Sequence, residues 1–72
     1  MGSELENSIR VQRAIKNITQ EELAAAVGVT RKTINTIENG IYTPSTVLAL
    51  RIARYFEVPV EEIFKLPGEE NS

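Results

Sequence analysis

The sequence predicts an all-α fold in which five short helices form a single compact domain. Apolar residues recur at intervals of three and four along the chain, and no segment alternates convincingly between apolar and polar residues. Ser or Thr precedes several of these apolar stripes, and Gly or Asn follows them, which is typical of capped helices. With 72 residues and no cysteine, the chain has room for one core, which helix packing alone must stabilise.

The first helix is expected to run from Leu5 to Lys16. Its apolar positions are Leu5, Ile9, Val11 and Ile15, the last two at a spacing of four residues. Asn17 follows the helix and tolerates the left-handed backbone that commonly ends one. We therefore expect Asn17 to be the cap.

The second helix is predicted to begin after Thr19. The run Thr19-Gln20-Glu21-Glu22 fits a capping box, in which the Thr hydroxyl and the Glu carboxylate each accept from a free backbone amide. Ile18 and Leu23 fit the hydrophobic contact that brackets such a cap. The helix is then expected to continue through Val27 and to end at Gly28, which adopts positive φ without steric strain.

The third helix is predicted to begin after Thr30 and to end at Gly40. Thr30 is a favourable N-cap, and Ile34 and Ile37 form an apolar stripe at a spacing of three residues. The stripe predicts which face of this helix packs against the core.

The fourth and fifth helices follow a turn at Thr43-Pro44. Ser45 is the expected N-cap of the fourth helix, whose apolar positions keep a 3.6-residue period: Leu48, Ala49, Ile52, Ala53 and Phe56. Pro59 suits the start of a short fifth helix over residues 60–65. The domain is expected to span residues 5–66, between a flexible N-terminus (1–4), consistent with a cloning remnant, and a flexible acidic tail (67–72).

The composition argues against an enzyme, because His, Cys and Asp are all absent. Their absence removes the usual general base, most zinc ligands and any Ser/His dyad. No cofactor, metal site or small-molecule ligand is indicated. No apolar run approaches the roughly 20 residues of a membrane span, and the first residues lack a secretory signal. We therefore expect a cytoplasmic protein with no membrane partner.

The net charge of −2 conceals a segregation along the chain. Residues 10–51 carry six Lys and Arg residues against three Glu residues, whereas both ends are acidic. Arg31 and Lys32 stand at the start of the third helix, where the helix dipole favours acidic residues. Either they are incidental surface charge, or a negative partner approaches this helix end.

Two short helices joined through Gly28-Val29-Thr30 fit a helix-turn-helix. Ala24, four residues before the turn glycine, is small enough to let the next helix pass close by. The polar residues of the third helix share one outward face: Arg31, Lys32, Thr33, Asn35 and Thr36. Such a set combines cations for phosphate with an Asn amide for an adenine edge and a Thr methyl for thymine. We therefore interpret the negative partner of this face as double-stranded DNA.

From Ile9 to Phe64, about three quarters of the chain, the sequence resembles the Cro and phage-repressor type of helix-turn-helix regulators, the xenobiotic-response-element family. The resemblance rests on these residues: Arg13, Thr19-Gln20-Glu21-Glu22-Leu23-Ala24, Val27-Gly28-Val29-Thr30, Thr33-Ile34, Ile37-Glu38-Asn39-Gly40, Pro44-Ser45 and the closing run from Val58 to Phe64. The sequence departs from the pattern at Gln12, Lys32 and Ile41. It also departs at Glu57, where Gly often ends the fourth helix in a left-handed conformation.

The resemblance implies a lambda-repressor-like domain whose third helix enters the major groove. It implies that Gln20 touches phosphate and braces this helix, and that Arg13 and Glu38 form a structural ion pair. The complete set of expected DNA-contacting residues is Gln20, Thr30, Arg31, Lys32, Thr33, Asn35, Thr36, Tyr42 and Thr43.

The sequence therefore predicts a sequence-specific, double-stranded DNA-binding transcriptional regulator, acting as a repressor. One such domain buries only about 600 to 1,000 Å² on DNA, so a homodimer on two half-sites about 34 Å apart is expected. We expect its contact surface to involve the fifth helix and tail, through Val60, Ile63, Phe64 and Leu66. The alternative is an antitoxin or adaptor module whose main role is to bind a partner protein.

Overall fold

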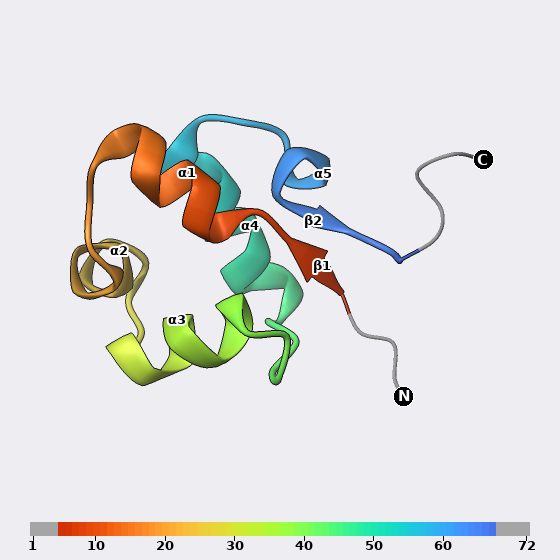
Figure 1. Cartoon of the computed structure of the whole chain (residues 1–72), viewed down its shortest axis with the longest axis horizontal. Coiled ribbons are helices and arrows are strands. Elements are labelled where there is room, and N and C mark those ends of the chain that lie inside the picture. The colour runs from red at the N-terminus through yellow and green to blue at the C-terminus, as the bar shows by residue number, and fades with distance from the viewer. Residues whose placement is uncertain (1–4, 68–72) are drawn as a thin grey trace.

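A computed structural model describes residues 5–67, in which five helices and one short pair of strands follow one another along the chain (Figure 1). The elements are β1 (Glu6–Asn7), α1 (Ile9–Lys16), α2 (Gln20–Val27), α3 (Arg31–Glu38), α4 (Thr46–Phe56), α5 (Val60–Ile63) and β2 (Phe64–Lys65). The predicted all-α class is confirmed in its five helices. The ends predicted to be flexible, residues 1–4 and 68–72, lie outside the described residues.

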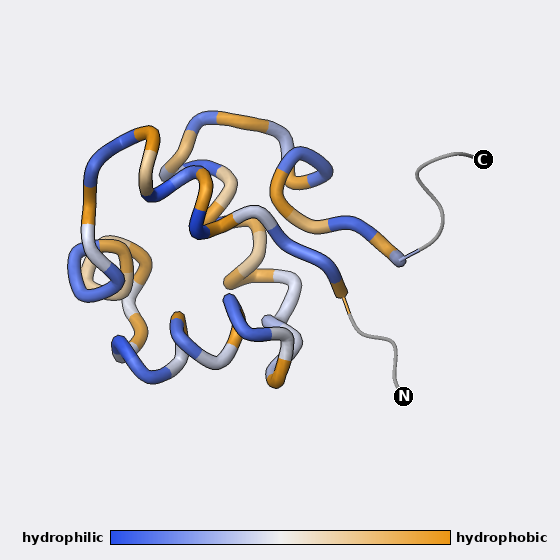
Figure 2. The backbone as a smooth tube through the Cα atoms, viewed as in Figure 1, coloured by the Kyte–Doolittle hydropathy of each residue, from blue (hydrophilic) through white to orange (hydrophobic). Residues whose placement is uncertain are grey.

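The helices surround one core to which each of them contributes. Six side chains of the described residues are fully buried: Ile9, Leu23, Ile34, Ile37, Ile52 and Ile63. Phe56 and Phe64 pack with them as well. Figure 2 shows apolar and polar residues interspersed along α1, α3 and α4, as expected of helices that bury a single face.

The caps predicted at the starts of α2, α3 and α4 are confirmed, whereas α3 ends at Glu38 with Asn39 as its cap and not at Gly40. At α2 the Thr19 side chain accepts from the Glu22 amide at 3.0 Å, and the Thr19 amide donates to the Glu22 carboxylate at 2.8 Å. At α3 and α4 the side chains of Thr30 and Ser45 accept from the amides three residues ahead, at 3.2 and 3.1 Å. These bonds satisfy amides that would otherwise lack a partner at each helix start.

Two helices end in a left-handed residue other than glycine. Asn17 has φ 59° and Glu57 has φ 61°, as predicted for both. A left-handed backbone costs a residue with a Cβ roughly 1–2 kcal/mol, and Asn bears it better than Glu. The chain therefore carries local strain at the end of α4.

The first helix is shorter than predicted, and its outer apolar pair is not part of the core. It begins at Ile9 rather than Leu5. Val11 and Ile15 are 58% and 71% exposed, whereas Ile9 is fully buried. At 100° per residue, Val11 lies about 200° from Ile9 around the helix, so burying one face exposes the other. The four-residue spacing correctly marked a shared face, but that face points to solvent.

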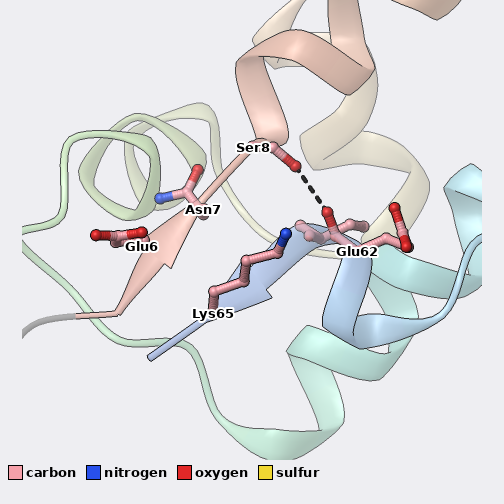
Figure 3. A pocket seen from close by; sticks show the side chains of 6 residues that line it. Glu6, Asn7, Ser8, Glu62 and Lys65 are labelled. Atoms are coloured by element: carbon pink, nitrogen blue, oxygen red, sulfur yellow. Dashed lines mark hydrogen bonds between the residues drawn. The ribbon is translucent and has the colours of Figure 1, made fainter. Parts of the chain in front are cut away.

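Residues 6–7 and 64–65 form an antiparallel strand pair that the sequence did not predict. Glu6 pairs with Lys65, and Asn7 with Phe64. Consequently the fifth helix ends at Ile63 and not at Lys65. Next to the strands, the Ser8 amide donates to the Ile63 carbonyl at 2.9 Å. The Ser8 hydroxyl donates to the Glu62 carbonyl at 3.0 Å, as Figure 3 shows. Strands of two residues are too short to show a periodic signal.

The side chain of Asn7 joins β1 to two helices. Its Nδ2 donates to the Ile37 carbonyl at 2.9 Å, near the end of α3, and its Oδ1 accepts from the Ile9 amide at 3.2 Å. One amide thus caps the end of α3 and the start of α1. The segment before α1 therefore helps to hold α3 in place.

The helices are all short. Within residues 5–67, none has both the length and the apolar character that crossing a bilayer requires.

Candidate nucleic-acid interface

The α2 and α3 helices pack closely through the turn at residues 28–30. Ala24 is 3% exposed, and its carbonyl accepts from the amides of Gly28 and Val29 at 2.9 and 3.0 Å. Gly28 has φ 84°, which turns the chain sharply after α2. In Figure 1, α3 runs along the lower edge of the molecule with α2 beside its start. One long face of α3 is therefore free of other elements.

That face carries the polar residues that the sequence assigned to it. Arg31 and Lys32 are exposed, and Thr33, Asn35 and Thr36 are half-buried. On the other side, Ile34 and Ile37 are 0% and 1% exposed. The predicted division of α3 into a core face and an outward face is correct.

The loop after α3 keeps Tyr42 and Thr43 at the surface near the end of this helix. Tyr42 is 50% exposed and Thr43 is exposed. The amides of Ile41 and Tyr42 both donate to the Thr36 carbonyl, at 2.9 and 3.2 Å. These bonds hold the backbone of the loop, up to Tyr42, against the last turn of α3.

The carboxylate of Glu38 is the centre of the polar contacts behind this face. Arg13 Nε lies 2.6 Å from Glu38 Oε2, and Arg13 Nη2 lies 3.2 Å from Oε1. This two-point ion pair is the one that the family resemblance implies. Arg13 also donates to the Ile18 carbonyl at 3.1 Å, and Arg10 Nε lies 3.4 Å from Glu38 Oε1. Glu38 thus links α1 to α3.

The Glu38 side chain is wholly inaccessible to solvent, and that of Arg13 is 16% exposed. Burial alone raises the pKa of the Glu38 carboxyl. Hydrogen bonds from Arg13 and Gln20, together with the charge of Arg13, outweigh burial and hold its pKa below the usual value. The carboxylate is therefore ionised at neutral pH.

The lowered pKa of Glu38 predicts a specific acid sensitivity. Because the unfolded chain binds this proton more tightly, the stabilisation is complete above the usual pKa of 4.5 and is lost as pH falls through the folded-state pKa. Urea unfolding between about pH 5 and about pH 3 should show the parent losing more stability than Glu38→Gln, which cannot titrate there. Parallel loss in the two proteins would contradict this assignment.

Gln20 connects Glu38 to the start of α3. Its Nε2 donates to Glu38 Oε1 at 3.1 Å, and its Oε1 accepts from Arg31 Nη1 at 3.4 Å. The Arg31 guanidinium is thereby held next to the N-terminus of α2 while remaining exposed. The bracing role that the resemblance implies for Gln20 has a direct structural basis in these two bonds.

Two residues near this face were missed by the sequence reasoning. Asn39 Nδ2 donates to Asn35 Oδ1 at 2.7 Å, and Arg10 Nη2 donates to Asn39 Oδ1 at 3.4 Å. The four-residue spacing of the two Asn residues on a helix was an available signal, since such positions are neighbours. Local spacing could not indicate the contact of Arg10 with Asn39, because Arg10 belongs to another helix.

The surface expected to mediate dimerisation is mostly unavailable. Ile63 and Phe64 are 0% and 9% exposed, and Val60 is half-buried. They pack into the core of their own domain because β2 returns to β1 and closes this side. Of the four residues, Leu66 remains exposed, at 56%.

Comparisons with known proteins agree with this geometry. A family model described as helix-turn-helix matches residues 9–63. An uncharacterized HTH-type transcriptional regulator of Methanocaldococcus jannaschii is 46% identical over 66 residues, covering 92% of this chain and the whole of that protein.

Two solved structures are also similar. The restriction-modification controller protein C.AhdI of Aeromonas hydrophila has 30% identity and a TM-score of 0.70, over 75% of this chain and 78% of its own. The SOS-response transcriptional repressor LexA of Eubacterium rectale has 26% identity and a TM-score of 0.74, over 86% and 66%.

Proposed function

Because the chain belongs to the helix-turn-helix family of DNA-binding transcriptional regulators, we propose that it represses transcription by occupying a specific operator as a homodimer. The observation that carries the proposal is the outward face of α3, on which exposed cations stand beside half-buried amide and hydroxyl groups. An α-helix of this kind fits the major groove, where base pairs are distinguished by their donors and acceptors.

In this proposal, residues at the two ends of α3 contact the DNA phosphates. Arg31 and Lys32 supply charge at its start, and the exposed Thr30 and the Gln20 amide lie next to them. Tyr42 and Thr43 offer hydroxyl groups at the other end. Such contacts fix the register of the protein on the duplex without reading its sequence.

In this proposal, residues in the middle of α3 contact the bases: Thr33, Asn35 and Thr36. The Thr36 hydroxyl donates to the Thr33 carbonyl at 2.9 Å, which leaves its methyl group as the part suited to a thymine methyl. Asn35 is the amide in this group, and amides distinguish bases through hydrogen bonds to their edges.

The size of the domain supports dimerisation. A single module buries about 600 to 1,000 Å² on DNA, and two copies on half-sites about 34 Å apart double the number of base contacts. Occupying the operator is by itself sufficient to obstruct polymerase, and a relative of known fold is described as a transcriptional repressor. The proposal contains no catalytic step, and it places the protein in the cytoplasm with its DNA target.

The proposal is tested by titrating a randomised duplex pool with the parent, Arg31→Ala, Asn35→Ala and the matched control Arg54→Ala, and then sequencing the bound DNA. If two copies contact about six phosphates, parent affinity should fall about a thousandfold between about 50 and about 200 mM salt. Arg31→Ala should bind about tenfold more weakly, and Arg54→Ala, altered on α4, should stay within about twofold.

The sequenced pool tests the dimer in the same experiment. Enrichment of a palindrome is expected, whereas a single enriched half-site would argue for a monomer. A folded parent that fails to bind at low salt would reject the repressor and favour the antitoxin or adaptor role.

A further inference from the structure

We propose that Asn39 and Arg10 orient the Asn35 amide so that it offers a hydrogen-bond donor to the major groove and thereby selects guanine. This inference rests on the proposed function, since it concerns which base the α3 face reads. It differs from the expectation, drawn from the sequence, that Asn35 reads adenine.

The first observation is a short hydrogen bond at the surface of α3. Asn39 Nδ2 donates to Asn35 Oδ1 at 2.7 Å, across one helical turn. Asn35 is half-buried and its backbone carbonyl accepts from the Asn39 amide at 3.1 Å, so the two residues are joined twice. The side-chain oxygen of Asn35 is thus already engaged within the protein.

The second observation fixes the direction of this bond. Arg10 Nη2 donates to Asn39 Oδ1 at 3.4 Å. A guanidinium has only donors, so it attracts the oxygen of Asn39 and turns the Asn39 nitrogen toward Asn35. The Asn35 oxygen in turn faces Asn39. A reversed pair of amides would set the Asn39 nitrogen against the guanidinium, donor against donor.

The direction of the bond between Asn39 and Asn35 depends on Arg10, whose position depends in turn on Glu38. Arg10 Nε lies 3.4 Å from Glu38 Oε1, and Arg13 fixes that carboxylate from the other side at 2.6 Å. The position of Arg10 is therefore set by the ion pair that docks α1 on α3. A chain of donors runs from Arg10 through Asn39 to Asn35.

The base that Asn35 reads depends on which part of its amide remains available to the DNA. Reading adenine bidentately requires the amide oxygen and nitrogen to face one base edge, where N6 donates and N7 accepts. The bond to Asn39 occupies one of the two lone pairs of the Asn35 oxygen and turns that oxygen toward Asn39, which disfavours the bidentate arrangement, whereas the Asn35 NH₂ group has no hydrogen bond among the described residues. Guanine presents two acceptors in the major groove, N7 and O6, and so matches a donor best.

The test uses the randomised duplex selection with the parent, Asn35→Ala, Asn39→Ala and Asn39→Asp. The base read by Asn35 is the operator position whose preference disappears in Asn35→Ala. The parent should favour guanine there over adenine by about fivefold to tenfold. In Asn39→Ala the amide turns freely, and the two bases should be enriched within about twofold of each other.

Asn39→Asp is the decisive variant because a carboxylate only accepts. It should draw the Asn35 nitrogen toward itself and turn the oxygen outward, shifting the preference to adenine or cytosine, whose amino groups donate. The added negative charge of Asp weakens binding to all sequences alike. It does not change the ratio between bases at one position, so any change in that ratio reports the orientation of the Asn35 amide. Thermal melting of each variant verifies that it is folded.

The outcomes separate the inference from the proposed function. If the parent enriches an operator but its preference is the same in both Asn39 variants, the inference is overturned and the proposed function stands. The same holds if Asn35→Ala alters no position. If the folded parent binds no duplex at all, both are overturned.

Discussion

Replacing Glu38 with Ala is expected to lower the free energy of unfolding by about 3 kcal/mol. The substitution leaves the Arg13 guanidinium, 16% exposed, without its counter-charge, and removes the acceptor shared by Arg10 and Gln20. An uncompensated buried charge is among the costliest local changes in a folded protein. A domain of this size has a total stability of about 4 to 11 kcal/mol, so the loss is a large fraction of it.

Urea unfolding measures this effect, with Glu6→Ala as the matched control. Glu6 is exposed and forms no ion pair among the described residues, so its loss should cost less than about 0.5 kcal/mol. The double variant Arg13→Met with Glu38→Leu should recover much of the stability, because no buried charge is left unpaired and Arg10 is exposed to solvent. A double variant as unstable as Glu38→Ala would show that the charge is not the cause.

Replacing Ile34 with Ala is expected to cost about 2 to 5 kcal/mol. Ile34 is fully buried on the core face of α3, directly behind the residues proposed to contact DNA. Its truncation removes apolar contact and leaves a cavity that the short helices can fill only by shifting α3. We therefore expect weaker DNA binding, together with a lower urea midpoint.

Ile15→Ala is the matched control, since it makes the same chemical change at a side chain that is 71% exposed. It should alter the unfolding free energy by less than about 0.5 kcal/mol. Equal destabilisation by the two variants would mean that Ile15 belongs to a buried surface, for instance between two copies of the chain.

Local signals predicted the starts of α2, α3 and α4 and the caps that end α1, α2 and α4, but not the start of α1 or the end of α5. Each depends on a few neighbouring residues, such as the hydroxyl of Thr19 three positions before Glu22. The outward face of α3 could be predicted for the same reason, because the positions of Ile34 and Ile37 determine which residues lie opposite. The position of these residues on the outward face of α3 could therefore be predicted from the sequence.

Contacts between distant segments could not be predicted in this way. The four-residue spacing of Val11 and Ile15 is the same whether the pair is buried or exposed, and only the docking of α1 decides between them. The pairing of β1 with β2 likewise shows why Ile63 and Phe64 are buried. The bond from Arg10 to Asn39 depends on how α1 meets α3, and local spacing carries no sign of it.

The strand pair that joins the two ends of the domain has a consequence for how the chain folds. Asn7 pairs with Phe64, so two segments that are 57 residues apart in the sequence must meet. Contacts between distant residues close a large loop and slow the folding of a domain, whereas the helix-turn-helix itself is local. During synthesis, α2 and α3 leave the ribosome before β2 exists. A nascent chain can therefore form α3 early, but the β1 strand that carries its Asn7 cap finds its partner only when residue 64 has been added.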